Sequence, residues 1–157
     1  MTTTTYVGLM VFLLVLASAM SNPSSEDHVG RQDFKDYLTV EWHLIVVNEL
    51  CGGKMLFLHC KSEDDDLGKH KIGVREKFSW GFRPNFWGTT HFWCYMHKDK
   101  AQATFNVFRM SLWIAQRCNC IWYDECNCIW IARDDGIYLQ NIPNKRDELM
   151  LHWEIEQ

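Results

Sequence analysis

The sequence predicts an all-β fold, a small antiparallel sandwich or barrel. Short apolar runs that alternate with polar residues recur at similar spacing along the chain. Turn residues such as Gly52-Gly53 and Asp134-Asp135-Gly136 separate these runs. Eight tryptophans and nine phenylalanines are most simply part of a packed core, with a carbohydrate-stacking surface as the alternative. Several short strands at this spacing are typical of antiparallel sandwiches and barrels.

The first 19 residues are predicted to be a secretory signal peptide. The run Val7–Ala17 is apolar but shorter than the about 20 residues of a membrane span, and Ala17-Ser18-Ala19 suits a cleavage site. A short membrane anchor is the alternative, because no Lys or Arg precedes the apolar run.

The remaining chain is predicted to be one domain behind a flexible arm. Residues 20–38 are polar and are assigned to the arm, and residues 39–157 to the β-sandwich domain. The net charge of -4 and the lack of a polybasic run argue against binding to nucleic acid or to a membrane surface. We expect no direct membrane insertion by the mature protein.

Strands are expected in the following order. The run Val40–Leu50 is predicted to turn back through Gly52-Gly53 into a Met55–Cys60 strand. Further strands are expected at Lys77–Phe82, Thr90–Met96, Ala103–Phe108, Cys128–Ala132, Ile137–Leu139 and Leu149–Ile155. Val107–Gln116 also fits a helical turn, and the final segment a short helix, although its alternation favours a strand.

The chain has seven cysteines, and in a secreted protein disulfides are the default. Cys60 and Cys94 each share a strand face with apolar neighbours, so both point into a core. The segment Cys118-Asn119-Cys120-Ile121-Trp122 is repeated as Cys126-Asn127-Cys128-Ile129-Trp130. The odd number leaves a free thiol or a covalent dimer, although a monomer is expected.

Metal binding and catalysis are the less favoured readings of these residues. The two Cys-x-Cys pairs and the histidines could bind a soft metal, but their spacing does not match structural zinc sites. The acidic run Glu63–Asp66 lacks the alternate-residue ligands of an EF-hand loop. No nucleophile-elbow motif surrounds a Ser or Cys. We therefore expect no metal, no cofactor and no catalytic residue.

Five blocks of sequence resemble, in the same order, the plant self-incompatibility protein S1 family, also called S-protein homologues. The resemblance spans about Thr39–Leu139. It rests on His59, Cys60, Lys61, Ser62, Asp64, Asp65, Asp66, Leu67, Gly68, Trp80, Phe82, Trp93, Cys94, Trp130 and Gly136.

The resemblance implies a small secreted plant protein with a β-sandwich fold, two disulfides and no known enzymatic activity. In the founding poppy members the protein is a stigma-secreted ligand that meets a membrane protein on incompatible pollen. Carried onto this chain, the family pattern pairs Cys60 with Cys94, and Cys128 with Cys120 or Cys118. Cys126 is less favoured, because a bond across one intervening residue is strained. Cys51 has no family counterpart and is the first candidate for the free thiol.

The expected function is that of an extracellular recognition or signalling ligand that binds a plant cell-surface membrane receptor through loops. The candidate loops are Gly68–Glu76 and Arg83–Gly88, with candidate recognition residues Lys69, Lys71, Arg75, Arg83 and Asn85. The acidic block is expected to serve the fold, by capping turns or pairing with Lys61 or Lys69. The alternatives are a secreted defence-type inhibitor or effector module and, with less support, a metal- or thiol-dependent secreted enzyme.

Overall fold

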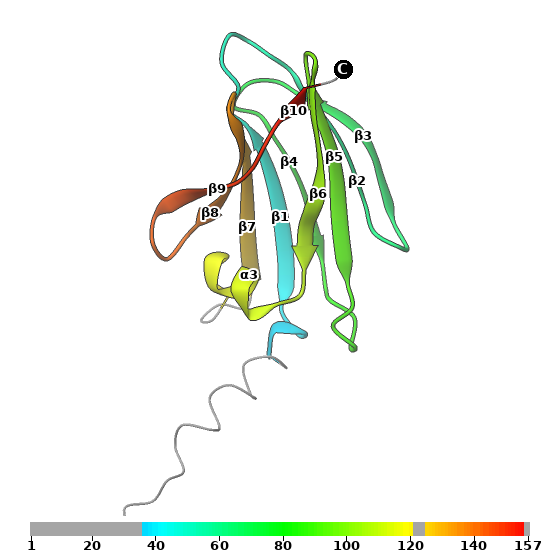
Figure 1. The fold of residues 1–157 in the computed structure, drawn as a ribbon. Coiled ribbons are helices and arrows are strands. Elements are labelled where there is room, and N and C mark those ends of the chain that lie inside the picture. The colour runs from blue at the N-terminus through cyan, green and yellow to red at the C-terminus, as the bar shows by residue number, and fades with distance from the viewer. Residues whose placement is uncertain (1–35, 121–124, 156–157) are drawn as a thin grey trace, which may run out of the picture. The chain divides into compact units, whose positions relative to one another are not determined.

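The computed structural model of the chain describes residues 36–120 and 125–155, which form two five-stranded sheets and one short helix (Figure 1). The first sheet has the order β4 (Lys77–Phe82), β1 (Glu41–Asn48), β7 (Glu125–Ala132), β8 (Gly136–Asn141), β9 (Arg146–His152). The second has the order β10 (Glu154–Ile155), β6 (Ala101–Arg109), β5 (His91–Lys98), β2 (Leu56–Lys61), β3 (Asp66–Ile72). The all-β sandwich prediction is confirmed. The predicted signal peptide lies outside the described residues.

The core lies between the sheets and is built by period-two alternation. Every second residue of β1, from Trp42 to Asn48, is buried, and so is every second residue of β2 from Leu56 to Cys60. Aromatic rings fill the space between the layers: the Phe82 ring lies 4.6 Å from that of Phe92 and 4.7 Å from that of Phe108. The aromatic residues therefore serve mainly as core, as their number suggested.

The predicted hairpin between the first two strands is wrong. β1 pairs with β4 and β7, whereas β2 pairs with β3 and β5 in the other sheet. The side chain of Asn48, which is fully buried, holds the crossing: its Nδ2 donates to the carbonyl oxygens of Lys54 and Ile72, both at 3.0 Å. Gly52 and Gly53 have positive φ angles and form a turn, which here connects strands of different sheets rather than paired strands.

The first sheet is also not wholly antiparallel. β1 and β7 run parallel along their whole lengths, from Glu41 beside Glu125 to Asn48 beside Ala132. These strands are far apart in the sequence, and a parallel pair needs a long crossover, here the β2–β6 strands and α3 (Leu112–Arg117). No turn motif in the sequence indicates that β1 and β7 pair, because turn motifs connect only neighbouring strands.

Two boundaries differ from the sequence-based expectation. The segment Asp66–Ile72 is a strand, although Gly68–Glu76 was expected to be a loop. Only Ile72 of this edge strand is buried, so its sequence lacks the apolar alternation that predicts strands. Tyr37, assigned to the arm, is 4% exposed, and its carbonyl accepts a hydrogen bond from Trp42 Nε1 at 3.1 Å.

The ambiguous segment Val107–Gln116 divides into two elements. Its first residues complete β6, and α3 follows, with the Ser111 side chain accepting a hydrogen bond from the Ile114 backbone at its start. The C-terminal segment forms β9 and β10, separated by Trp153. Among residues 36–120 and 125–155, no helix has the length and apolar character needed to cross a membrane.

Candidate functional site

The acidic block is the turn of the β2–β3 hairpin, and Ser62 closes it. Ser62 Oγ accepts hydrogen bonds from the backbone N–H groups of Asp65, at 2.9 Å, and Asp64, at 3.3 Å. The Ser62 N–H donates to the Asp65 carbonyl at 2.8 Å. Glu63, Asp64 and Asp65 are exposed. Hydrogen bonds within the turn therefore satisfy these three backbone N–H groups, and three carboxylates are left in water.

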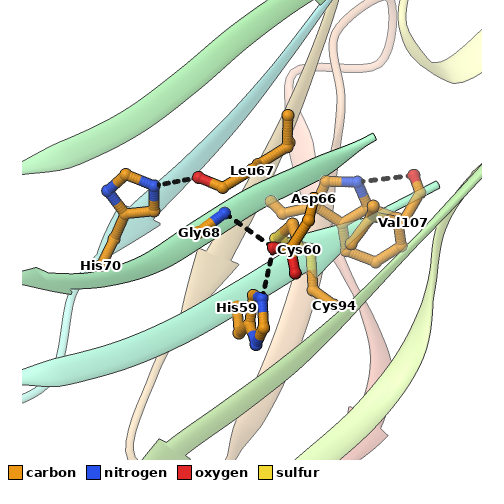
Figure 2. The surroundings of a disulfide bond; sticks show 9 residues. His59, Cys60, Asp66, Leu67, Gly68, His70, Cys94 and Val107 are labelled. Carbon is orange, nitrogen blue, oxygen red and sulfur yellow. Dashed lines mark hydrogen bonds and ion pairs between the residues drawn. A yellow bond between two sulfur atoms is a disulfide. The ribbon is translucent and has the colours of Figure 1, made fainter. Parts of the chain in front are cut away.

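The fourth acid, Asp66, is the centre of a small charged network. Its Oδ1 accepts hydrogen bonds from His59 Nε2 at 2.5 Å and from the Gly68 N–H at 2.9 Å (Figure 2). Its Oδ2 lies 2.8 Å from Lys61 Nζ. The hydrogen bonds from Lys61, His59 and Gly68 hold the pKa of the Asp66 carboxyl well below its usual range. Lys61 is thus the partner of the acidic block, and Lys69 is not.

The neighbouring signature residues also build the hairpin. Gly68 has a φ of +80°, and the Leu67 carbonyl accepts a hydrogen bond from His70 Nε2 at 2.7 Å (Figure 2). The His70 ring stacks on Phe78, with centroids 3.8 Å apart. The hydrogen bond stabilises β3 locally, and the ring contact joins this edge strand to β4 of the other sheet.

The remaining signature residues lie in or next to the core. Trp130 Nε1 donates to the Val107 carbonyl at 3.0 Å, which ties β7 to β6. A Cβ at Gly136 would lie 2.5 Å from the Leu151 carbonyl oxygen, so only glycine fits where β8 meets β9. Trp80 and Phe82 pack against Phe92. Trp93 instead lies on the outer face of β5, with its ring 5.3 Å from that of His91.

The described part of the chain contains three disulfides, one more than expected. Cys60 is bonded to Cys94, Cys118 to Cys128, and Cys120 to Cys126. Cys60 and Cys94 are directly opposite in the β2–β5 pair (Figure 2). The expectation of two disulfides is wrong, because each cysteine of the first repeat bonds to one cysteine of the second. The Cys120–Cys126 bond lies within the loop that the Cys118–Cys128 bond closes.

Cys51 is the free cysteine of the described residues and is exposed. Its N–H donates to Asp134 Oδ2 at 2.8 Å, and Lys54 Nζ reaches Asp134 Oδ1 at 3.1 Å. A side-chain hydrogen bond between the Cys51 thiol and the Asp134 carboxyl raises the pKa of the thiol and lowers that of the carboxyl. A catalytic cysteine needs the opposite shift, toward the thiolate. Within residues 36–120 and 125–155, no three His, Cys, Asp or Glu side chains are grouped to hold a metal ion.

The five predicted recognition residues do not form one site. Lys69 and Lys71 lie on the strand β3 and not in a loop. Arg75 has a φ of +65° in the tight turn between β3 and β4, where its N–H donates to the Asn48 carbonyl. Arg83 and Asn85 follow the other end of β4. The strand β4 thus separates Arg75 from Arg83 and Asn85.

Asn85 organises the loop between β4 and β5, residues 83–90. Its side chain donates to Thr89 Oγ1 at 2.7 Å and accepts from the Thr89 N–H at 2.9 Å. Its N–H donates to Thr90 Oγ1 at 2.8 Å, and its carbonyl accepts from the Gly88 N–H at 2.9 Å. Pro84 is buried. Four hydrogen bonds to one residue therefore join the two ends of this loop.

Two aromatic residues stand out at the tip of the same loop. Phe86 and Trp87 are each 81% exposed, and their rings form an edge-to-face pair with centroids 5.4 Å apart. Sequence reasoning selected this loop but missed these two side chains. The signal was available: two adjacent large aromatic residues lie between Pro84 and Gly88, in a segment too polar at its ends to be a strand.

A cleft of about 180 Å³ lies between this loop and the acidic turn. The residues that line it come from both segments and from the adjoining strands: Ser62, Glu63, Asp64, Asp65, Phe82, Arg83, Asn85, Thr89, Thr90, His91 and Phe92. Carboxylates, hydroxyls and one guanidinium therefore line one concave surface, and the exposed aromatic pair belongs to the same loop. Such a surface can bind a polypeptide through hydrogen bonds and an apolar anchor.

Comparisons with known proteins agree with this structure. Residues 43–153 match the family described as plant self-incompatibility protein S1. S-protein homolog 1 of Arabidopsis thaliana is 40% identical over 152 residues, which cover 92% of this chain and 95% of the relative. S-protein homolog 74 of the same plant is 40% identical over 156 residues, covering 94% and 93%.

One solved structure shares the fold. It is described as a self-incompatibility protein homologue, from a widespread family of small, highly stable, secreted plant proteins. It superimposes with a TM-score of 0.50 at 16% identity and covers 76% of this chain and 97% of that one. The matched family residues, the two relatives and the shared sandwich lead to one conclusion: the chain belongs to the plant self-incompatibility protein S1 family of small secreted proteins, the S-protein homologues.

Proposed function

We propose that this protein is an extracellular recognition ligand that binds a plant cell-surface membrane protein through the loop 83–90 and the cleft beside it. It acts without catalysis, as a monomer, and with no nucleic-acid partner. A secreted chain meets membrane proteins from outside the cell, so an exposed binding surface is sufficient for this role. The binding surface is the end of the sandwich that carries the β2–β3 turn and the β4–β5 loop.

The observation that carries the proposal is the exposed pair Phe86 and Trp87. Each side chain is 81% exposed, whereas most other large aromatic side chains of the described fold are packed in or against the core. Leaving such side chains in water forfeits about 1.5–3 kcal/mol each that burial would provide. Aromatic residues in this situation are typical anchors of protein interfaces.

The rigidity of the loop supports the same role. Because Asn85 already orders the loop, binding need not supply the entropy of ordering it. The carboxylates of the acidic turn and the guanidinium of Arg83 flank the cleft and can select a partner of complementary charge. The raised pKa of Cys51 keeps its thiol protonated, which supports a role without thiol chemistry.

The test is binding of the tagged, secreted protein to pollen and to protoplasts, with unlabelled protein as competitor. We expect saturable binding that is at least tenfold weaker for the Phe86→Ala/Trp87→Ala variant, because two interface anchors are removed. The variant should keep wild-type unfolding temperature, because neither side chain packs in the core.

Ile155→Ala is the matched control. Ile155 is 79% exposed, but it lies on β10, away from the loop 83–90 in the ribbon view (Figure 1). Its removal should leave binding unchanged. Equal competition by the Phe86→Ala/Trp87→Ala variant and the wild type would overturn the proposal, as would the absence of a saturable site. Inhibition of a secreted enzyme by the same loop, with no cell-surface binding, would favour the defence-type inhibitor instead.

A further inference from the structure

We propose a second binding surface, on the outer face of the sheet that contains β2, β3 and β5, which binds an acidic polysaccharide through its uronate carboxylates. The ligand class is a linear polyuronate. This surface shares no residue with the loop 83–90, so the inference does not rest on the recognition function proposed above. Three features carry it: strand register, unpaired cations and an aromatic groove.

The strand register brings two rows of side chains to this face. In one row, Phe57 lies opposite Lys71 on β3 and opposite His97 on β5. In the next row, His59 lies opposite Lys69 and opposite Tyr95. Because Leu56, Leu58 and Cys60 point into the core, Phe57 and His59 must point outward. Lysines, imidazoles and aromatic rings are therefore neighbours on one surface.

Lys69 and Lys71 are neighbouring cations on one strand face, and neither has a carboxylate partner in the described part of the chain. Within residues 36–120 and 125–155, no carboxylate forms an ion pair with Lys69 or Lys71, and both are exposed. Lys61 on the same face pairs with Asp66. In the other sheet, Arg133 at the end of β7 contacts Glu49 and Asp147. The chain carries a net charge of -4, so two uncompensated cations side by side are not the result of a basic composition.

The groove between the two rows has a volume of about 150 Å³. Its lining includes Phe57, His59, Lys69, Tyr95 and His97. The rings of Phe57 and His97 stack with centroids 4.5 Å apart, and the Tyr95 ring, 37% exposed, lies 5.7 Å from His97. The Lys71 ammonium group lies 5.2 Å from the centre of the Phe57 ring. The Tyr95 ring and the edges of the stacked Phe57 and His97 rings can contact the C–H face of a sugar, while the lysine ammonium groups bind the carboxylates.

The charge pattern favours a polyuronate over a protein or a membrane. The cores of protein interfaces are depleted in lysine, but lysines adjoin this groove. Membrane-surface recognition uses clusters of roughly four to eight Lys or Arg, and this face offers two without acidic partners. Lys69 and Lys71 are alternate residues of a strand, about 6.6 Å apart along it. A polymer with regularly repeated carboxylates can contact both at once.

The test is calorimetric titration of the full secreted protein with a polygalacturonate oligomer of ten units. We expect binding that weakens at least tenfold in the Lys69→Gln/Lys71→Gln variant and weakens with added salt. The matched control, Lys77→Gln/Lys145→Gln, removes two exposed lysines elsewhere that also lack ion pairs within the described fold. This control should bind like the wild type. Tyr95→Ala should also weaken binding, without a change in salt dependence.

Titrations with other ligands test whether the uronate carboxylates are the groups that bind. The fully methyl-esterified oligomer, which lacks the charge, should bind at least tenfold more weakly than the acid. Equal binding of both forms, or equal loss in the Lys77→Gln/Lys145→Gln control, would overturn the proposal. Equal or tighter binding of poly-glutamate or of phosphatidylserine vesicles would also overturn it. The Phe86→Ala/Trp87→Ala variant should retain oligomer binding, so this inference and the proposed recognition function can fail separately.

Discussion

The acidic β2–β3 turn and the loop 83–90 line the same cleft, but they leave different chemistry exposed. The turn exposes Glu63, Asp64 and Asp65, whose carboxylates are well solvated in water and need no partner. The loop exposes Phe86 and Trp87, whose rings become more stable when a partner buries them away from water. In both segments a polar side chain accepts hydrogen bonds from the backbone, Ser62 in the turn and Asn85 in the loop.

This difference shows that the most conspicuous stretch of sequence need not be the binding site. In the signature block, the polar groups with defined partners bond to one another, which is what a structural role requires. In the loop, Asn85 holds the backbone through hydrogen bonds, but two large apolar side chains are left in water, which is typical of an interface. Three predictions test whether the signature block stabilises the fold, beginning with the largest expected effect.

The largest effect is expected for the disulfide beneath the acidic turn. The Cys60→Ala/Cys94→Ala variant opens a loop closed across 34 residues. Restoring the freedom of the unfolded chain should lower the free energy of unfolding by about 4 kcal/mol. Urea unfolding monitored by tryptophan fluorescence measures it. Cys51→Ala, which removes the exposed thiol, is the control and should change stability by less than about 0.5 kcal/mol. A loss below about 1 kcal/mol in the double variant would contradict the prediction.

A smaller, pH-dependent effect is expected for Asp66→Asn. The folded-state pKa of Asp66 is lowered, so its ionised form stabilises the fold above the unfolded-state pKa of about 3.9. This stabilisation is lost as the pH falls from that value toward the folded-state pKa. The stability difference between wild type and variant should thus be largest near pH 7 and shrink below about pH 3.9.

Urea unfolding at pH 7, 4 and 3 measures this difference. Other acids also titrate in that range: hydrogen bonds from Asn141, Arg117 and Arg146 lower the pKa of Glu148 to about 2. Because Glu148 is present in both proteins, subtracting the two curves removes its contribution. A difference that is the same at all three pH values would show that Asp66 acts through packing rather than charge.

The smallest effect is expected for the exposed acids. Glu63→Gln/Asp64→Asn/Asp65→Asn should change the free energy of unfolding by less than about 0.5 kcal/mol, because none of the three forms an ion pair within the described fold. Secretion should be normal. A loss as large as that of Asp66→Asn would mean that the charge of the whole turn is structural. Loss of cell-surface binding alone would extend the recognition surface from the loop 83–90 across the cleft.

Much of the fold could be predicted because it depends on local patterns. The alternation of Leu56, Leu58 and Cys60 with polar or outward-facing residues identifies a strand and its buried face. The same logic failed for Asp66–Ile72, since an edge strand with one buried residue has no apolar alternation to read. It also failed at Gly52-Gly53, where a turn signal is the same whether the chain stays in its sheet or leaves it.

The candidate site was predicted only in part. The segment Arg83–Gly88 was predicted to be a recognition loop, with Arg83 and Asn85 as the candidate residues, but Asn85 holds the loop through internal hydrogen bonds. The exposure of Phe86 and Trp87 was not predicted, because most aromatic residues of the described fold are packed in or against the core and the sequence alone does not show which ones are not. The cysteine repeat is a similar case. It predicts disulfides, but the sequence alone does not give the nested pairing of Cys118 with Cys128 and of Cys120 with Cys126.

The sequence by itself determined the class of fold, the faces of most strands and the family, since period-two alternation and short motifs are properties of neighbouring residues. Only the tertiary structure decided which strands pair, that β1 and β7 run parallel, and which side chains share a surface. It placed Lys69 and Lys71 beside Phe57 and His59, and the acidic turn beside the loop 83–90. These are contacts between residues distant along the chain, and they form because the whole set of strands must bury its apolar faces together.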